Sequence, residues 1–346
     1  MKKKAITLVV LLAMLVGCSR NESSSAPSVS SEGEVSTSEV NSETTSEESS
    51  VASSEELPSS EELSSEEPSS EEPPSSSENP TNYPDTPAGI EVPQSVFEYY
   101  ASVDFNKTGN NLKLELYNKI KGHVSTSYSG LNTTMATTDR NWDLSPDPND
   151  SNPYMVLIYA SYNDTNPKKY STRTRNDVWD KEHIWAKSHG NFGNTPPAGS
   201  DMHHLRASDK RNNGSRGNLD FGKANSVKST INDYDGKPSG KTGTQTGKSG
   251  TVYEPLPQYR GDVARAMFYM ATRYHNDTQT QLTLVDNTTS SSTGAGKFGI
   301  LSTLLEWHLQ DPVDEFEFRR NGLVQGYQNN RNPYIDFPSL AHDVFG

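Results

Sequence analysis

Two stretches of the sequence gather residue types that carry acid–base and metal chemistry. WDKEHIWAKS, residues 179–188, places Glu182 beside His183. DMHHLRASDKRNNGSRGN, residues 201–218, adds two adjacent histidines and an Asn-Gly-Ser-Arg run. An unperturbed histidine accepts a proton near neutral pH. Carboxylate and amide oxygens suit Mg²⁺, Mn²⁺ or Ca²⁺ better than zinc. These residue types therefore indicate activation of water beside a hard divalent cation.

Hydrolysis of a phosphodiester fits this set of residues. The reaction needs a base that activates water, a cation beside the developing charge and a donor for the leaving oxygen. His183 is suited to the first task, and a cation can supply the other two. The neighbouring Arg206 and Arg216 can hold flanking phosphates. Arg216 is equally suited to an ion pair on a helix surface.

The surrounding elements decide whether these residues meet. We expect strands at 181–187 and 201–207, and Ser208 and Asp209 are suitable N-cap residues for a helix that follows. Such a strand–loop–strand–helix unit could bring the Glu-His pair and one face of the helix around a single ion.

The second stretch leaves several roles open. Asp201, His203 and His204 could orient the site or donate to phosphate. Because side chains alternate along a strand, we expect only one of the two histidines to face the site. Which of the two does so stays open, and His203 is named as the catalytic candidate. Asn213 precedes a glycine, and Asn-Gly is also a common turn signal.

The rest of the chain favours an α+β fold, because helices and few strands follow one another without regular alternation. The sequence contains no GxGxxG, P-loop or HExxH motif. Hydrophobic spacing predicts the helices, and a short apolar run predicts a buried strand. We expect helices at 93–122, 260–275, within 297–313 before Pro312, and at 314–328, a strand at 153–162, a surface loop at 236–251 and an extended segment at 329–338.

The first residues predict export. Three lysines precede an apolar run at 5–16 that is too short to span a bilayer comfortably. The run ends in Leu-Val-Gly-Cys, which resembles a lipobox, so 1–17 is interpreted as a lipoprotein signal and Cys18 as the lipid-attachment residue. The product would be anchored to the outer face of the cell membrane. An ordinary secretory signal, with release outside the cell, is the alternative. Cys18 is the only cysteine, so no internal disulfide can form.

A Ser/Glu-rich segment follows the cysteine. Residues 21–80 carry sixteen acidic and no basic residues, and such a composition cannot bury enough apolar surface to fold. We predict a disordered linker at 18–85 that separates the anchor from a catalytic domain at 93–346. A protein-binding tail is the alternative.

The acidic linker hides the charge of the remaining chain. The whole chain has a net charge of -14, but residues 81–346 sum to only -2. Residues 165–228 hold twelve Lys and Arg against six Asp and Glu. The region around the two motifs would therefore attract a polyanion.

The motifs EHIWAKS, DMHHLRASD and NGSRGN resemble the bacterial endonuclease I family. These are secreted or periplasmic nucleases of the ββα-metal (His-Me finger) superfamily. RGDVARAMFYMATRY, LLEWHLQDPVDEFE and NRNPYIDFP are also similar to segments of that family. The motifs follow the family's order, and together they cover roughly residues 95–346.

The resemblance implies a ββα-metal core in which His183 is the general base and Glu182 and Asn213 bind one Mg²⁺, with Mn²⁺ or Ca²⁺ as substitutes. Arg216 and His203 are the further catalytic candidates, and Arg206 competes with Arg216 for the scissile phosphate. The implied enzyme is a metal-dependent endonuclease that cleaves DNA, and RNA as well, with little sequence preference and leaves 5′-phosphate ends. Nothing indicates a protein partner, and we expect a monomer.

The sequence departs from the family pattern in two respects. Ala186 and Ala207 stand where many members have proline, and the disulfides of some relatives are impossible here. Two other functions compete with the nuclease. One is a zinc hydrolase using His183, His189 and His203 or His204 with Asp201. The other is a non-catalytic surface adhesin on an acidic stalk, although binding alone would not require the Glu-His-Asn set.

Overall fold

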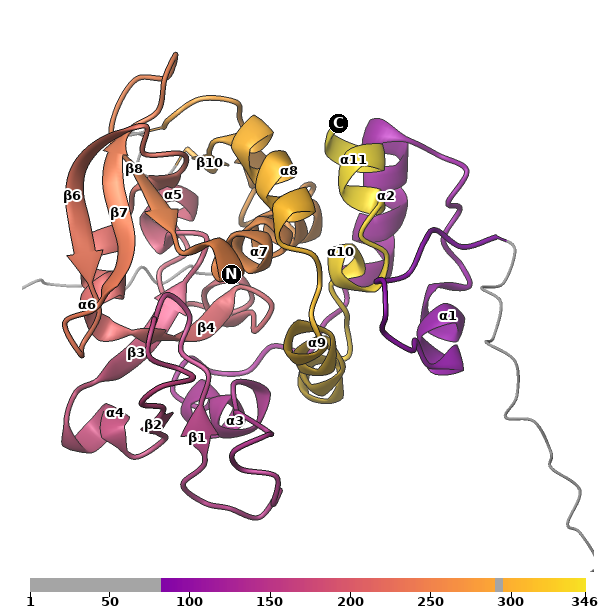
Figure 1. Ribbon diagram of the computed structural model, residues 1–346. Helices are drawn as coiled ribbons and strands as arrows, with labels where there is room; N and C mark the ends of the chain where they lie inside the picture. The colour runs from indigo at the N-terminus through magenta and orange to yellow at the C-terminus, as the bar shows by residue number, and fades with distance from the viewer. Residues whose placement is uncertain (1–81, 290–294) are drawn as a thin grey trace, which may run out of the picture. The chain divides into compact units, whose positions relative to one another are not determined.

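The computed structural model describes residues 82–289 and 295–346 (Figure 1). The predicted signal peptide, Cys18 and nearly all of the predicted linker lie outside these residues. Helices and short strands are mixed along the described chain, which confirms the predicted α+β class. Within 82–289 and 295–346, no helix is long and apolar enough to cross a membrane.

Helix α7 (Arg260–Arg273) lies at the centre of the helical part. All but one of its fourteen residues are buried, and its Ala, Met and Arg residues have high helix propensity. Helices α8, α2 and α10 pack against it, and α11 packs against α2 and α8 (Figure 1). The helices other than α7 are α1 (Gln94–Tyr100), α2 (Gly109–Ile120), α3 (Leu131–Thr138), α4 (Thr172–Arg175), α5 (Lys187–Gly190), α6 (Lys210–Arg216), α8 (Leu301–Gln310), α9 (Glu315–Gln328), α10 (Pro333–Asp336) and α11 (Leu340–Phe345), with 3-10 turns at Ala198–Ser200 and Pro257–Tyr259.

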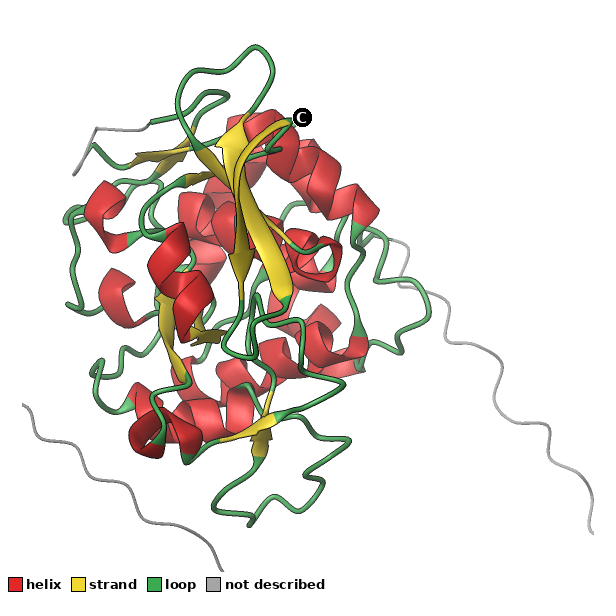
Figure 2. Ribbon diagram, turned by 60° about the vertical axis from the view of Figure 1, so that its left-hand side comes forward, coloured by secondary structure: helices red, strands yellow, loops and turns green. Residues whose placement is uncertain are grey.

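The strands form small separate sheets. The four-stranded sheet has the order β5-β8-β7-β6, with β5 parallel to β8 and the other pairs antiparallel. Its long β6 and β7 strands stand out in Figure 2, and both contact α6. The strands are β1 (Tyr154–Met155), β2 (Lys168–Lys169), β3 (Trp179–His183), β4 (Leu205–Asp209), β5 (Asp220–Phe221), β6 (Ser226–Asn232), β7 (Pro238–Thr244), β8 (Val252–Pro255), β9 (Thr283–Leu284) and β10 (Lys297–Phe298).

Strands β3 and β4 and helix α6 form the predicted strand–loop–strand–helix unit, but β3 already ends at His183 and β4 begins only at Leu205, so the predicted strand segments 184–187 and 201–204 are not strand. The two strands are antiparallel, with His183 opposite Leu205 and Trp179 opposite Asp209. Helix α6 follows β4 without a connecting loop, because Asp209 ends the strand and its side chain accepts a hydrogen bond from the Asn212 amide. This is the N-cap that the sequence predicted.

One face of the β3–β4 pair anchors the unit. Trp179, Leu205 and Ala207 lie in a buried apolar cluster together with residues of α3 and α9, such as Met135 and Val324. Alternation along β3 then directs Glu182 to the opposite face, where it meets α6. Burial of the apolar face therefore fixes the register that orients the candidate site residues.

Several element predictions need correction. The helical stretch 93–122 is two helices, α1 and α2, separated by a turn around Asp104. Only Tyr154–Met155 of the predicted strand 153–162 is a strand, because the backbone turns at Tyr159, whose φ is 72°. The segment 329–338, expected to be extended, contains α10.

The largest error concerns the predicted loop 236–251. It contains β7, which lies inside the four-stranded sheet rather than on the surface as a loop. Its glycines are required by close packing, since a Cβ at Gly243 would lie 2.2 Å from the Ser226 carbonyl oxygen. The glycine content that indicated a loop instead allows two strands to approach closely.

Candidate active site

A cavity of about 310 Å³ opens beside β3, α5 and α6. It collects four of the five predicted catalytic and metal-binding residues, which come from β3 and from one face of α6. The lining residues are Tyr128, Asp180, Lys181, Glu182, His183, Ala186, Lys187, Ser188, Asn213, Arg216, Gly217 and Asn218. The Glu-His pair and the helix face therefore do meet at one place.

His183 lies at the end of β3 with one ring nitrogen already occupied. Its Nε2 is 3.1 Å from the Gly199 carbonyl oxygen, and because a carbonyl only accepts hydrogen bonds, Nε2 carries the proton. In the neutral ring this leaves a lone pair on Nδ1, which has no hydrogen-bond partner among the described residues. The ring stacks on Tyr128, with centroids 5.5 Å apart and planes 7° apart.

The surroundings keep this imidazole neutral. Burial, and then the neighbouring His204, lower the pKa of His183 to about 3. A neutral imidazole with a free Nδ1 is the form that can accept a proton from water. At neutral pH the ring is therefore in the protonation state that a general base needs.

Glu182 divides its two carboxylate oxygens between protein and cavity. Oε1 accepts a hydrogen bond from the Tyr159 hydroxyl at 3.1 Å and lies 3.2 Å from Nη1 of Arg216. No side chain of the described residues donates a hydrogen bond to Oε2, while the backbone amide of His183 also interacts with the carboxylate. Burial raises the pKa of Glu182 to about 7, against the opposing effects of Arg216 and Tyr159. A cation bound to Oε2 would favour the ionised form.

Asn213 presents its amide oxygen in the same way. Its Nδ2 donates to the Lys181 carbonyl oxygen at 3.3 Å, which leaves Oδ1 without a partner in the described part of the chain. The helix that carries it begins at the Asp209 cap and ends at Gly217, where φ is +59°. That positive φ favours glycine at the C-cap and ends α6 at Arg216.

Arg216 has contacts that differ from those of a phosphate clamp. Its guanidinium donates to the carbonyl oxygens of His183 at 3.1 Å and Ile184 at 2.6 Å and pairs with Glu182. The residue is only 1 % exposed. These contacts hold the end of β3 against α6, so the structure favours a positioning role over the predicted contact with the scissile phosphate.

His203, the other predicted catalytic residue, does not line the cavity. Its Nε2 meets the Asn330 carbonyl oxygen at 3.1 Å, and its ring packs on Tyr269. His204 does not line the cavity either, but its ring centroid lies 5.5 Å from that of His183. The two rings do diverge, but both histidines lie in the turn before β4, so the alternation argument, which left open which of them faces the site, does not apply.

The same contacts weaken the zinc alternative. Both ring nitrogens of His189 face carbonyl oxygens, Lys297 at 3.0 Å and Asn218 at 2.8 Å. In residues 82–289 and 295–346, no three His, Cys, Asp or Glu side chains are grouped so that they could hold a metal. One carboxylate and one amide are hard oxygen donors, which suit Mg²⁺ better than zinc.

Sequence reasoning missed the residues that hold the site residues in place. Tyr159 and Tyr128 come from segments distant in sequence, and Gly199 contributes only its carbonyl oxygen. Lys181 donates to the Tyr128 carbonyl oxygen at 2.6 Å and lies over its ring, 3.6 Å from the centroid. No residue pattern marks these contacts, because each depends on how distant segments pack.

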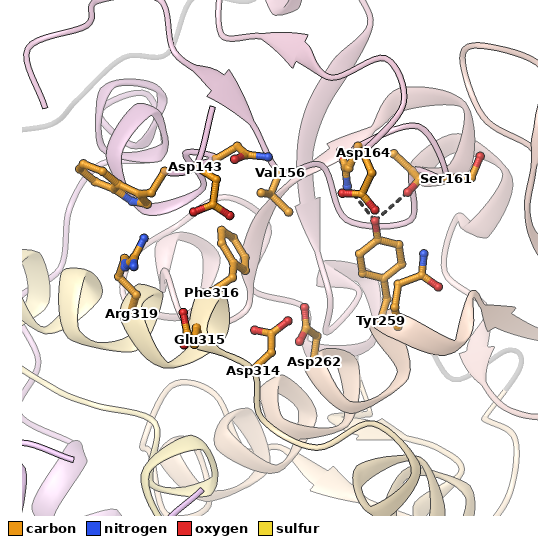
Figure 3. A pocket seen from close by; sticks show the side chains of 15 residues that line it. Asp143, Val156, Ser161, Asp164, Tyr259, Asp262, Asp314, Glu315, Phe316 and Arg319 are labelled. Carbon is orange, nitrogen blue, oxygen red and sulfur yellow. Dashed lines mark hydrogen bonds between the residues drawn. The ribbon is translucent and has the colours of Figure 1, made fainter. Parts of the chain in front are cut away.

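A second cavity of about 320 Å³ lies between the 156–164 segment and the start of α9. Figure 3 shows the carboxylates of Asp143, Asp262, Asp314 and Glu315 around its centre, beside Phe316. It contains none of the predicted site residues, and its negative charge would repel a polyanion. It is therefore not the candidate site.

The sequence profile of the family described as Endonuclease I matches residues 108–339. The chain is 38 % identical over 269 residues to an extracellular ribonuclease of Bacillus amyloliquefaciens, covering 77 % of this chain and 84 % of that protein. It is 39 % identical over 251 residues to an extracellular ribonuclease of Bacillus subtilis (strain 168), covering 71 % and 78 %. The family match spans every residue that lines the cavity.

Proposed function

Because this chain belongs to the endonuclease I family and is therefore a nuclease, we propose that it acts outside the cell as a metal-dependent endonuclease with a ββα-metal core. It cleaves phosphodiester bonds of both RNA and DNA, with little sequence preference, and leaves 5′-phosphate ends. The observation that carries the proposal is the convergence of His183, Glu182 and Asn213 on one cavity, where no side chain of the described residues hydrogen-bonds to His183 Nδ1, Glu182 Oε2 or Asn213 Oδ1.

In this proposal His183 is the general base. Its Nδ1 accepts a proton from the water that attacks phosphorus, while Nε2 keeps its own proton on the Gly199 carbonyl oxygen. The attacking oxygen comes from water and not from a ribose 2′-hydroxyl, so the mechanism works on DNA as well as RNA. The RNA products would then carry 5′-phosphates rather than 2′,3′-cyclic phosphates.

Glu182 and Asn213 would hold the cation, and their hard oxygen donors fit Mg²⁺. When bound, the cation supplies positive charge beside the scissile phosphate. Lys187 and Asn218 lie at the cavity wall and are exposed, so they can contact the flanking backbone. Contacts with phosphates carry no base code, which accounts for the slight sequence preference.

The location outside the cell is part of the proposal. The two Bacillus relatives are described as extracellular, and residues 1–17 have the pattern of a signal. We propose that Cys18 carries a lipid and that residues 18–85 connect it to the enzyme. Cys18→Ser should shift the protein from the detergent phase to the aqueous phase in a detergent partition of bacterial lysate. Equal partition of both proteins would leave an ordinary secretory signal as the explanation.

A cleavage assay tests the enzymatic part. Purified protein is incubated with plasmid DNA and with RNA of defined sequence, first in EDTA and then with Mg²⁺ restored. We expect cleavage only with Mg²⁺, and His183→Ala should lower the rate by about 10²–10⁴-fold. His342→Ala, which alters an exposed histidine of α11, is the matched control and should retain the full rate. Undiminished cleavage by His183→Ala would remove His183 from the reaction.

A further inference from the structure

We propose that Tyr159 is a positioning residue for the cation site, because its hydroxyl fixes one oxygen of Glu182 and thereby leaves the other for the metal. This inference rests on the proposed function and deepens it. Tyr159 belongs to neither of the motifs that mark the site, and it does not line the cavity. It would act only through Glu182.

Within the described chain, the Tyr159 hydroxyl makes one hydrogen bond, to Glu182. The side chain is completely buried, and its hydroxyl donates to Glu182 Oε1 at 3.1 Å. The ring is held edge-on by Tyr253, with centroids 5.3 Å apart and planes 69° apart. Tyr253 in turn donates to Asn212 Oδ1 on α6. The hydroxyl is therefore held in place from the helix that also carries Asn213.

The backbone conformation at Tyr159 is an unfavourable one that the neighbouring residues impose. Its φ of 72° lies in the left-handed region, which costs a bulky residue free energy and persists only where the surroundings impose it. The surroundings do so here. Ile158 donates to the Ala207 carbonyl oxygen at 2.9 Å and accepts from the Asp209 amide at 3.2 Å. Strand β4 therefore holds the turn that directs the ring toward Glu182.

Both side-chain donors to Glu182 contact the same oxygen. Tyr159 and Arg216 each contact Oε1, at 3.1 and 3.2 Å. With Oε1 held at two points, the carboxylate cannot rotate freely, and Oε2 stays directed away from both donors. Partners of this kind orient metal ligands, and their loss typically weakens metal affinity by about 10- to 100-fold.

The chain offers a matched control for a purely structural tyrosine. Tyr100 is also completely buried, and its hydroxyl donates to Asp336 Oδ2 at 2.8 Å. Asp336 is likewise paired with an arginine, Arg331, at 2.6 Å. Each tyrosine–carboxylate–arginine group thus loses the same hydroxyl in a Tyr→Phe change, but only the Glu182 group borders the cavity.

The test measures Mn²⁺ binding by calorimetry on the full-length protein without nucleic acid, for the parent, Tyr159→Phe and Tyr100→Phe. We expect Tyr159→Phe to weaken binding about tenfold and Tyr100→Phe to leave it unchanged, although both lower the melting temperature. Titrations are run well below the lower melting temperature, so that loss of folded protein does not enter the comparison. Equal Mn²⁺ affinity in the parent and Tyr159→Phe would make Tyr159 a structural residue and overturn the inference.

A double-mutant cycle with Glu182→Gln tests whether the effect passes through Glu182. Adding Tyr159→Phe to Glu182→Gln should weaken Mn²⁺ binding no further, whereas an independent tenfold loss would contradict the proposed route. Failure of the proposed function has a different signature: the parent itself would bind no Mn²⁺ and would cleave in EDTA. If only the Tyr159 inference fails, the parent still requires metal for cleavage, and the parent and Tyr159→Phe bind Mn²⁺ with the same affinity.

Discussion

At the residue scale, the chemistry of the cavity depends on which polar atoms of its side chains already have hydrogen-bond partners within the protein. Glu182 gives one oxygen to Tyr159 and Arg216, and His183 gives one ring nitrogen to the Gly199 carbonyl. Each side chain is thereby fixed and keeps one lone-pair atom free. A site built in this way should respond to protons and metal ions through those free atoms alone.

Proton competition at Glu182 gives a pH-dependent prediction. Burial raises the pKa of Glu182 to about 7, so the metal-free carboxyl gains a proton as the pH falls below 7. A metal ligand must be deprotonated; the half-saturating Mg²⁺ concentration should therefore rise about tenfold per pH unit below 7 and level off above 8. The neutral form of His183, whose pKa is lowered to about 3, should persist throughout. Initial cleavage rates titrated with Mg²⁺ between pH 5.5 and 8.5 measure this.

Glu182→Gln is the control for this titration. Glutamine has no proton to lose, so the variant should need more Mg²⁺ at every pH but show no trend with pH. A half-saturating concentration in the parent that is constant across the range would mean that Glu182 does not bind the metal.

The sequence identified the residues whose chemistry is local and failed for those whose role depends on packing. Adjacent Glu182 and His183, with Asn213 on the following helix, were predicted to meet, and they line one cavity. Arg216 and His203 were predicted from residue type, but an arginine serves carbonyl oxygens as well as phosphates. His203 and His204 lie in the turn before β4, so the direction of each ring depends on the path of that turn, which no residue pattern marks.

At the scale of elements, α6 is the part that positions the site. Asp209 ends β4 and caps α6, and its carboxylate accepts hydrogen bonds from the Asn212 amide, the Tyr162 hydroxyl and the Tyr234 amide at 2.8–2.9 Å. One side chain thus joins the strand, the helix and the β6–β7 turn. Its loss should disturb both stability and the placement of Asn213.

We expect Asp209→Ala to lower the free energy of unfolding by about 2–4 kcal/mol. About 1 kcal/mol comes from the lost cap, and the rest from buried donors left without a partner. The half-saturating Mg²⁺ concentration should also rise, because the first turn of α6 loosens. Urea unfolding and Mg²⁺ titration of the cleavage rate measure the two effects.

The matched control is Asp314→Ala. Asp314 caps α9 through the Glu317 amide at 2.7 Å, away from the cavity. The Asp314→Ala substitution should lower the free energy of unfolding by about 1 kcal/mol or less and leave the Mg²⁺ dependence of the cleavage rate unchanged. If Asp209→Ala unfolds no more readily than Asp314→Ala, the capping contact does not hold the unit together.

Strongly periodic elements could be predicted, while elements formed by pairing with distant strands could not. Helices α7 and α8 repeat apolar residues at helical spacing and were recognised as helices. Strand β7 has the composition of a loop, because Gly243 must allow Ser226 of β6 to approach it. The apolar run at 153–162 is buried as expected, but burial alone does not make a strand.

At the scale of the whole molecule, the charge is divided more sharply than the sequence suggested. Three of the twelve basic residues in 165–228 are buried, against four of the six acidic ones, so nine basic and two acidic residues remain at least partly exposed. Residues 21–80 carry sixteen acidic residues and no basic ones. One chain therefore carries exposed basic residues in 165–228, which attract a polyanionic substrate, and an acidic segment, which repels it.

This division gives the last prediction, which compares the full chain with a chain that starts at residue 82. With two to four phosphate contacts, kcat/KM on nucleic acid should fall about ten- to hundredfold between 50 and 200 mM salt for both proteins. At low salt the shorter chain should be faster, because the acidic segment no longer repels the substrate. The two rates should converge as salt screens charges beyond about 10 Å. Equal rates at low salt would mean that the acidic segment stays far from the substrate, and a flat salt response in both proteins would mean that the basic residues of 165–228 do not contact it.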